Sequence, residues 1–558
     1  MEADGWGMAK GGPAASLEKR TERLQLRSPF THSYKTQVLD CGLQPYLRLG
    51  NRIPAARREQ LPAAAKMPAP PLPILFAEDT PFSEYSAAVW GRVFNAMRDF
   101  HRRPVAVVQA THRAHVVEAV KLAKEKGWRV SVRSGGHSWA AWSVRDEALL
   151  IDLGGFGKDE GGEDELVYDK STGVVSCAPA RTGREVNGFL AGQLGGPGDD
   201  SEEGVGRFFP GGHCPDVGLG GFLLQGGMGW NCKNWGWACE NIVAIDVVTA
   251  DGNELRCSET ENPDLFWAAR GSGPGFPAVV VRFHLRTRPL SGMYQSLYFY
   301  SLDRFEEILN WVIKICPTAP PSTEIVLLTL TPPGADAPQV MANFLSFKPD
   351  PEDLIPLHSS HPSRPLQTVF ANPTSLPQQY VDQDASNPPA HRYISENSYV
   401  SNDADVPKVL KKAFTTLPTP QSFALYFSMN PCSRRVQLGS AAANGDVDEK
   451  AKTMPDMALS MQSDHYFALY TIYPDAEDDE RCHGWVQDVM KDVEKKSAGS
   501  YLGDADFRHR RTKFWGDEQG KKLMQIRKEW DPEGRICGYL DADDKSGAEG
   551  LKNEFEWA

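Results

Sequence analysis

The stretch VRSGGHS, residues 132–138, sets two glycines beside a histidine where a predicted strand ends. Glycine at such a point indicates a turn with positive φ, or a backbone that another group must approach closely. Upstream, PVAVVQ (104–109) has the pattern of a short buried strand, and a helical repeat follows between a Thr111 cap and a Gly127 stop. WRVSVRS (128–134) is the second strand. Because ligands bind at the strand ends of such units, residues 132–138 are a candidate site.

A second glycine-rich stretch, GLGGFLLQGGMG at 218–229, holds six glycines in twelve residues. Bare main-chain N–H groups suit an anion, and a flat ring can lie against a backbone that has no side chains. Neither stretch has the spacing of a Rossmann fingerprint or of a P-loop, so the two commonest nucleotide folds are disfavoured. Taken alone, SGGH is also compatible with a tight turn beside a buried histidine.

Apolar runs predict further strands on both sides of the second stretch. ALLIDL (148–153) and GVVSCA (173–178) precede it, and IVAIDVVTADGNEL (242–255) follows as a hairpin that turns at an Asp-Gly pair. AVVVRFHLRTRPL (278–290) alternates apolar and polar residues and closes this half of the chain. We expect a domain boundary near Pro289.

Residues 291–500 mix strand and helix patterns, which is typical of an α+β domain. The strand patterns are EIVLLTLT (324–331), SFALYFSM (422–429) and HYFALYTIY (465–473), and the helix patterns are RFEEILNWVIKIC (304–316) and CHGWVQDVMKDVEKK (482–496). The proline-rich residues 358–377 are predicted to form a loop, and GKKLMQIRKEW (520–530) a final helix.

Bulk composition excludes several classes of protein. The 558 residues carry a formal charge of −13 without a dense basic block, so neither nucleic acid nor an anionic membrane is an expected partner. No apolar run reaches the roughly 20 residues of a membrane helix, and the N-terminus lacks a signal-peptide pattern. With ten cysteines and no glycosylation site, a cytoplasmic or other intracellular soluble protein is predicted. Residues 1–75 are expected to be a weakly ordered leader, within which Met67 offers an alternative start.

Several longer motifs occur together in one order. They are RPVAVVQ, VVEAVKLAKEKGWRVSVRSGGHSW, IDLGG, GGHCPDVGLGG, GGMGWNCKNWGWACENIVAIDVVTADG and NPDLFWAARGSG. From about residue 100 to 290 the chain thereby resembles the FAD-binding module of the vanillyl-alcohol-oxidase/PCMH flavoproteins, in the berberine-bridge-enzyme-like branch. SYLGDADF and FWGDEQGKKLMQIRKEWDPEGR resemble the terminal segment of the same branch.

The resemblance implies an α+β fold in several parts. These are a two-part PCMH-type FAD-binding domain at 76–290 with its core at 100–290, a substrate-binding domain at 291–500 with an antiparallel sheet flanked by helices, a segment at 501–545 that returns to the FAD-binding domain, and a tail at 546–558.

The resemblance also implies which residues bind FAD. His137 would be bonded to the 8α-methyl group of the flavin, and Cys214 matches the position whose sulfur joins ring carbon 6 in bicovalent members. For Cys214, a buried inert thiol is the alternative. The residues matching the pyrophosphate cradle are Arg133, Ser134, Gly135, Gly136 and Ser138. Those of a second cradle are Gly218, Gly220, Gly221, Gly226, Gly227 and Gly229, and Ile242 and Val243 match the segment at the pyrimidine edge. For Arg133, a surface ion pair is the alternative.

Four further positions bear on FAD binding and catalysis in the resemblance. Gln225 and Gly503 stand where relatives often have glycine and asparagine, and Gly503 puts one local FAD contact in doubt. Val217 matches the residue at which a small side chain admits oxygen and a leucine blocks it. Tyr470 is the candidate general base, because relatives carry the base on the corresponding strand; a core tyrosine is the alternative.

The function so implied is an FAD-dependent oxidoreductase, with an oxidase favoured that passes hydride from a substrate C–H bond to FAD and electrons to O2. A dehydrogenase with another acceptor, or a silent flavin- or ligand-binding protein, are the alternatives. No metal-site motif and no G-x-S-x-G elbow is present. The expected partners are a small-molecule substrate and O2, in a monomer or weak oligomer. The substrate stays open among sugars, alkaloids, cannabinoid-type polyketides and aromatic alcohols.

Overall fold

The computed structural model describes residues 71–158, 165–201, 204–437, 453–506, 510 and 512–539. All of them belong to one unit of the chain, Lys66–Ala558. Most of the expected leader, Met67 and the expected tail at 546–558 lie outside the described residues. Within the described part of the chain, no helix is both long and apolar enough to cross a bilayer.

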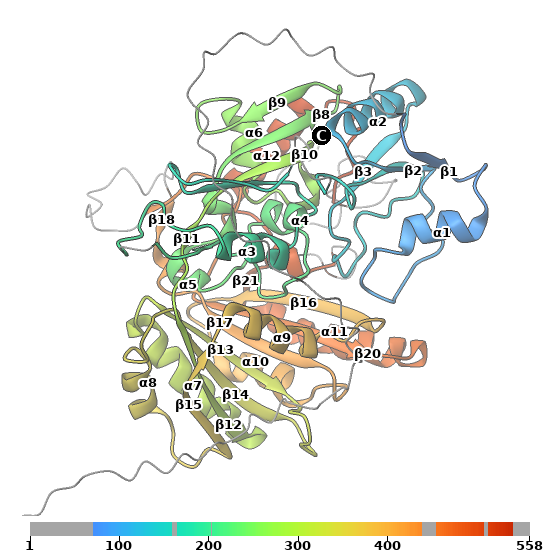
Figure 1. The fold of residues 1–558 in the computed structure, drawn as a ribbon. Helices are drawn as coiled ribbons and strands as arrows, with labels where there is room; N and C mark the ends of the chain where they lie inside the picture. The colour runs from blue at the N-terminus through green and yellow to red at the C-terminus, as the bar shows by residue number, and fades with distance from the viewer. Residues whose placement is uncertain are drawn as a thin grey trace, which may run out of the picture. The chain divides into compact units, whose positions relative to one another are not determined.

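A four-stranded sheet and its helices begin the unit (Figure 1). Its elements are β1 (Ile74–Phe76), α1 (Phe82–Trp90), β2 (Ala106–Gln109), α2 (Arg113–Lys126), β3 (Arg129–Arg133) and β4 (Ala148–Asp152). The sheet order is β1-β2-β4-β3, and β4 pairs in parallel with both β2 and β3. The predicted strand–helix–strand unit is therefore present. Gly127 ends α2 with φ 69°, but the N-cap is His112 rather than Thr111, whose hydroxyl lies 3.4 Å from Nδ1 of His115.

A five-stranded antiparallel sheet forms the second part of this half. Its strands are β5 (Val167–Asp169), β6 (Val174–Cys177), β8 (Ile242–Thr249), β9 (Glu254–Cys257) and β10 (Ala278–Arg286), in the order β5-β6-β10-β8-β9. Between β6 and β8 lie α3 (Gly183–Ala191), β7 (Arg207–Phe208), α4 (Leu219–Leu224) and α5 (Cys232–Trp235). After β9 come α6 (Pro263–Ala268) and β11 (Arg288–Pro289), which pairs with β7. The predicted hairpin is confirmed, and Gly252 turns it with φ 78°.

The other half is built on an eight-stranded sheet in the order β15-β12-β14-β13-β17-β20-β16-β21, in which every pair is antiparallel. Its strands are β12 (Met293–Ser301), β13 (Thr323–Leu330), β14 (Gln339–Ser346), β15 (Gln367–Thr374), β16 (Arg392–Val400), β17 (Phe423–Ser428), β20 (His465–Tyr473) and β21 (Ser497–Gly499). The helices are α7 (Phe305–Ile315), α8 (Leu354–Ser360), α9 (Leu376–Ser386), α10 (Val406–Thr415) and α11 (Asp479–Val493). The predicted α+β fold with an antiparallel sheet flanked by helices is present.

Strand alternation gives this sheet two different faces. Along β20, Phe467 and Leu469 pack in one apolar cluster with α7, α10 and α11, while Tyr466, Ala468 and Tyr470 join the cluster that contains the second glycine-rich stretch. The sheet therefore turns one face to its helices and the other to the glycine segments.

The predicted loop at 358–377 is wrong in its middle. Residues 367–374 form β15, which pairs only with β12 at the edge of the sheet. Pro373 made a strand look improbable, because proline lacks an N–H donor. On an edge strand this is tolerated, since one side of the strand has no partner that needs the donor.

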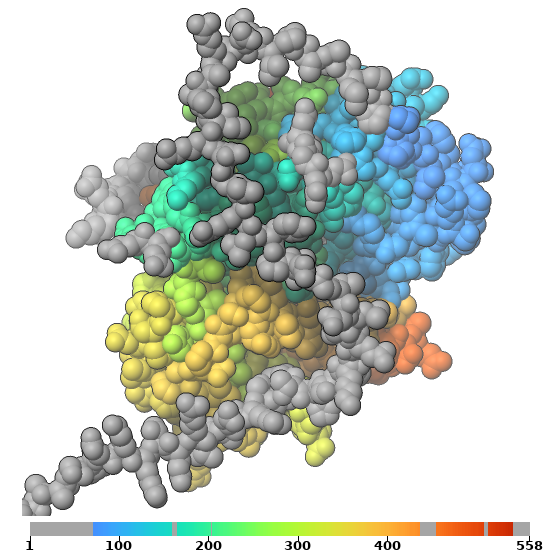
Figure 2. All heavy atoms as spheres, in the orientation of Figure 1, coloured from blue at the N-terminus to red at the C-terminus, as the bar shows by residue number. Residues whose placement is uncertain are grey.

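The chain after β21 makes contact with the first half. The helix α12 (Asp517–Trp530) approaches α6 through a hydrogen bond of 2.6 Å from the Trp530 indole to Asp264. Farther on, Ile536 bridges to Val130 in β3. In Figure 2 the gold α9 lies directly below the teal surface of α3, and here Asn187 donates to the Tyr380 hydroxyl at 2.9 Å.

Candidate functional site

The two glycine-rich stretches lie against each other although they are far apart in the chain. A Cβ on Gly218 would stand 2.5 Å from the Gly135 nitrogen and 2.7 Å from Oγ of Ser134, and a Cβ on Gly135 would stand 2.5 Å from the Gly218 nitrogen. Both positions therefore need glycine for a backbone-to-backbone approach. Gly136 adds a positive φ of 81°. This close contact holds residues 132–138 in place.

Replacing Gly218 by alanine is expected to lower the free energy of unfolding by about 1–3 kcal/mol, because the added methyl group must displace backbone atoms. Gly221 is the matched control: it lies in α4, the helix that Gly218 caps, and a Cβ there meets nothing within 4 Å. Thermal or urea unfolding of Gly218→Ala and Gly221→Ala measures the difference. Equal stability of the two variants would contradict the contact.

Residues 134–138 form an open run of donors beside this contact. All five are half-buried, between the buried Arg133 and the buried Ala140. Within the described part of the chain, none of their main-chain N–H groups has an acceptor. Because unpaired N–H groups away from bulk water are costly, such a run fits an anionic ligand.

Arg133 lies directly before this run and supports it through buried contacts. Its guanidinium is fully buried, lies 2.7 Å from Asp152, and also donates to the carbonyl oxygens of Val89 and Ala88. Arg92 also binds Asp152 and donates to the Ser134 carbonyl oxygen at 2.9 Å. The Arg133 side chain thus forms an internal ion pair, and its buried Nε has no hydrogen-bond partner among the described residues.

His137 belongs to the same run and contacts the aromatic rings of Phe94 and Trp139. Its ring stacks on Phe94, with ring centroids 4.3 Å apart. Burial lowers the pKa of His137 to about 4, against an opposing effect of Asp216. The imidazole is therefore neutral at physiological pH and has a free lone pair on one ring nitrogen.

Cys214 has the opposite electrostatic setting. Burial, followed by the carboxylates of Asp504, Asp384 and Asp216, raises the pKa of its thiol to about 12. Its sulfur lies 3.7 Å from Nδ2 of Asn387. A protonated thiol is a poor nucleophile, so any bond formed by Cys214 needs a neighbour that removes the proton.

His213, the residue before Cys214, is paired with a carboxylate. Its Nε2 lies 2.9 Å from Glu324 at the start of β13, and the other Glu324 oxygen accepts from the Asn231 backbone N–H. The sequence analysis did not single out this pair, because Glu324 is 111 positions away in the chain.

Tyr470 faces the same region from β20. Its ring stacks on Phe423, with centroids 4.6 Å apart, and meets the edge of Trp139 at 6.3 Å. Burial, and then the charge of Asp504, raises the pKa of the Tyr470 hydroxyl well above its usual value. Electrostatic interaction with Cys214 also raises this pKa.

Asp504 is the site residue that the sequence analysis missed. It accepts a hydrogen bond of 2.7 Å from Tyr466, and burial raises its pKa above the usual range, against the opposing effects of Tyr466 and Tyr470. Asp504 belongs to the motif SYLGDADF, in which the sequence comparison concerned the neighbouring Gly503. A Cβ on Gly503 would stand 2.4 Å from the Tyr501 ring, so glycine is required there for packing.

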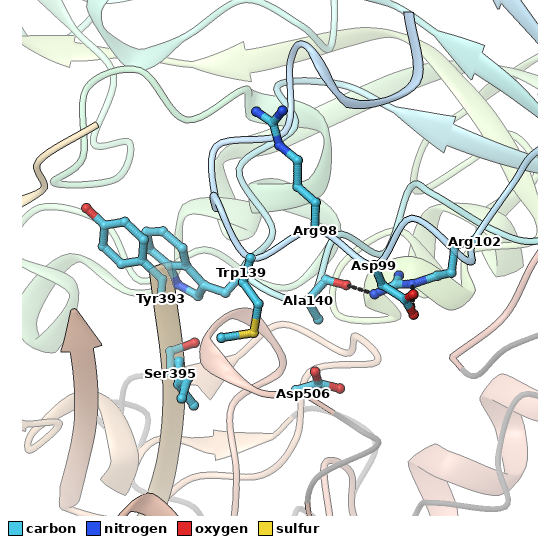
Figure 3. A pocket seen from close by; sticks show the side chains of 10 residues that line it. Arg98, Asp99, Arg102, Trp139, Ala140, Tyr393, Ser395 and Asp506 are labelled. Atoms are coloured by element: carbon cyan, nitrogen blue, oxygen red, sulfur yellow. Dashed lines mark hydrogen bonds and ion pairs between the residues drawn. The ribbon is translucent and has the colours of Figure 1, made fainter. Parts of the chain in front are cut away.

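An aromatic wall borders a cavity of about 120 Å³ next to these residues (Figure 3). Trp139 and Tyr393 stack with centroids 4.5 Å apart, and their rings overlap at one side of the cavity. Asp506 and Ser395 lie at another side. At the far end, Arg102 donates to the Ala140 carbonyl oxygen at 3.0 Å. The cavity therefore combines flat apolar surface with polar groups.

Comparison with known proteins identifies the family. The model of the FAD binding domain family matches residues 104–258. The chain is 36% identical over 485 residues to the FAD-linked oxidoreductase janO of Penicillium janthinellum, which spans 86% of this chain and 99% of that protein. The chain is an FAD-linked oxidoreductase. The sequence motifs had predicted this membership.

Solved structures agree with the fold of this oxidoreductase. BBE-like 1 of Physcomitrella patens matches with a TM-score of 0.65 at 19% identity, covering 84% of this chain and 96% of that chain. The carbohydrate oxidase of Microdochium nivale matches with a TM-score of 0.66 at 21% identity and the same coverage. At these identities the likeness concerns the fold alone.

The two glycine-rich stretches of the oxidoreductase differ in how well they could bind FAD. The open N–H run at 134–138 suits a pyrophosphate, and the half-buried Val243 follows Ile242 at the start of β8. In the second stretch, the N–H groups of Gly220, Gly226 and Gly227 already donate to protein oxygens.

Close packing explains most glycines of that second stretch. A Cβ on Gly229 would stand 2.2 Å from the Pro210 carbonyl oxygen, and one on Gly227 2.8 Å from the Phe222 ring. Gly221 alone among its six glycines has open space in the Cβ direction. The glycines of the second stretch therefore serve mainly to let the backbone pack closely around the site, and few of their N–H groups are left to bind a ligand.

Proposed function

We propose that this oxidoreductase is an oxidase, which takes hydride from a C–H bond of a small organic molecule and passes the electrons to O2 as H2O2. The observation that carries the proposal is that three features lie close together: the N–H run at 134–138, the neutral His137, and Tyr470. Trp139 links them, because its ring contacts the rings of both His137 and Tyr470. FAD, when bound, supplies the acceptor for the hydride.

In this proposal His137 and Cys214 hold the flavin covalently. The neutral imidazole is ready to form its bond, whereas the Cys214 thiol must first lose its proton. The residues of the first cradle hold the pyrophosphate through their main-chain N–H groups, and Ile242 and Val243 line the pyrimidine edge.

Tyr470 and Asp504 would move the substrate proton. In this proposal Tyr470 would accept a proton from a substrate hydroxyl or amine while its own proton passes to the Asp504 carboxylate, whose pKa Tyr470 affects. The raised pKa of Asp504 favours this transfer, because a more basic carboxylate is a better acceptor. Because the two proton transfers occur together, Tyr470 does not have to become a free phenolate first.

Val217 would control access of oxygen to the site. It is half-buried and directly precedes the glycine contact at Gly218. We expect Val217→Leu to lower the rate of reoxidation under air at least about tenfold, a barrier rise of 1.4 kcal/mol. The anaerobic bleaching rate with substrate serves as the control and should stay unchanged. Reoxidation that is equally slow in the unchanged protein would favour the dehydrogenase.

The test of the proposed function is a screen of sugars, aromatic alcohols, amines and alkaloids against the yellow protein. Bleaching without oxygen together with peroxide release in air supports the oxidase. Bleaching without peroxide supports a dehydrogenase, and a yellow protein that no compound bleaches supports a silent binding protein. The stacked rings of Trp139 and Tyr393 favour a ligand with a flat or apolar face, since such faces pack on aromatic rings.

A further inference from the structure

Two thiols from the two halves of the chain meet at the base of the second glycine stretch. Cys232 begins α5, just after Gly229, and Cys432 begins the short helix Cys432–Arg434 that follows β17. Both are almost fully buried in one cluster, and the two short helices that they begin are in contact with each other. Neither has a role in the proposed chemistry.

A fixed cation lies on one of these thiols. Nη2 of Arg435 lies 3.0 Å from the Cys432 sulfur, and the same guanidinium binds both oxygens of Glu240 at 2.7 Å. The Glu240 carboxylate in turn accepts from the Trp237 N–H at 2.7 Å. The ion pair therefore holds the guanidinium in place beside the sulfur.

The two thiols differ in acidity. Hydrogen bonding from Cys232 and the charge of Arg435 lower the pKa of Cys432, while burial raises the pKa of Cys232. An acidic thiol next to a second thiol is the arrangement in which oxidation yields a disulfide, because the first sulfur reacts and the second resolves it.

We propose that Cys432 is a peroxide-sensitive thiol and that Cys232 resolves it to an internal disulfide. The Cys432 thiolate attacks one oxygen of H2O2, the O–O bond breaks, hydroxide leaves, and a sulfenic acid forms. The Cys232 sulfur then attacks the sulfenic sulfur, the S–O bond breaks, and water leaves with the Cys232 proton. Two thiols lose two electrons in total, and one H2O2 becomes two H2O.

The disulfide would join the FAD-binding half to the substrate half. Cys232 is bound through its N–H to the Gly229 carbonyl oxygen at 3.2 Å, and Cys432 packs under the eight-stranded sheet. The oxidised protein would thus carry a covalent link between the glycine segment and the sheet that carries Tyr470. H2O2 is the expected product of the proposed oxidase, but the inference holds for peroxide from any source.

The test uses the full-length flavoprotein without substrate, so its outcome does not depend on the proposed oxidase activity. Reduced protein is treated with added H2O2, and the reaction is stopped with acid. The protein is then unfolded, its free thiols are alkylated with N-ethylmaleimide, and it is digested. Mass spectrometry is expected to show one peptide pair joined through Cys232 and Cys432, with two fewer alkylated thiols, reversed by dithiothreitol. Alkylation of both cysteines after peroxide treatment would overturn the proposal.

Variants separate the roles of the three residues. Cys232→Ser should leave a sulfenic acid on Cys432 that dimedone traps, and Arg435→Met should slow oxidation about tenfold, the equivalent of one pKa unit. Cys239→Ser is the matched control, because it removes a buried thiol of the same cluster and should leave the cross-link intact. A cross-link that forms equally fast in Arg435→Met would refute the role of the cation.

Discussion

The double variant His137→Ala/Cys214→Ala is expected to release all of its flavin when it is precipitated with acid. The unchanged protein should give a yellow pellet and the double variant a colourless one, because the two proposed covalent bonds are gone while the N–H run at 134–138 still binds FAD reversibly. Turnover of the double variant should fall at least about tenfold, or 1.4 kcal/mol in the barrier. Absorbance of the pellet and supernatant measures the flavin directly.

The single variants should differ from each other. The neutral His137 can bond without help, whereas the protonated Cys214 depends on a neighbour, so Cys214→Ala is expected to keep more bound pigment than His137→Ala. Cys482→Ala is the control for the loss of a buried thiol away from the site, because Cys482 lies in α11 within the other apolar cluster. A colourless pellet from the unchanged protein would rule out both covalent bonds, and a yellow pellet from the double variant would assign the bond to another residue.

Replacing Asp504 by asparagine is expected to slow bleaching of the flavin by substrate by about 10²–10⁴-fold. Asparagine keeps the size and can still accept from Tyr470, but it cannot take up a proton. Tyr470→Phe should show a comparable loss, and the double variant little more, because both act in one proton transfer. Anaerobic stopped-flow absorbance measures the rate.

A control on the same strand tests specificity. Tyr473 lies three residues after Tyr470, on the opposite face of β20, and donates to Asp479 at 2.8 Å. Tyr473→Phe should therefore leave the bleaching rate nearly unchanged. If Asp504→Asn bleaches as fast as the unchanged protein, the proton has another acceptor.

The pH profile adds an independent check on Asp504. Proton uptake requires the ionised carboxylate, so the bleaching rate should rise as pH rises through the pKa of Asp504. Burial raises this pKa above its ordinary value near about 3.9, so the rise should occur at correspondingly higher pH. In Asp504→Asn this limb of the profile should disappear.

Local sequence determined several elements of the FAD-binding half, among them β2, α2, β3, β4, β6, β10 and the β8–β9 hairpin, but not β1, which begins within the expected leader. Alternation and helical spacing act between near neighbours, and Gly127 and Gly252 mark their turns through positive φ, so these strands and helices could be predicted. The edge strand β15 could not, because its partner β12 lies far away in the chain and Pro373 has the composition of a loop.

The motifs around His137 and Cys214 determined the family and its cofactor. Only the tertiary structure decided that Tyr470 lies beside Trp139, that Asp504 is buried next to Tyr466, and that the second glycine stretch mainly serves close packing. The reason is physical: register and side-chain contact across a sheet depend on residues distant in sequence, and burial sets the pKa values only after those residues have met.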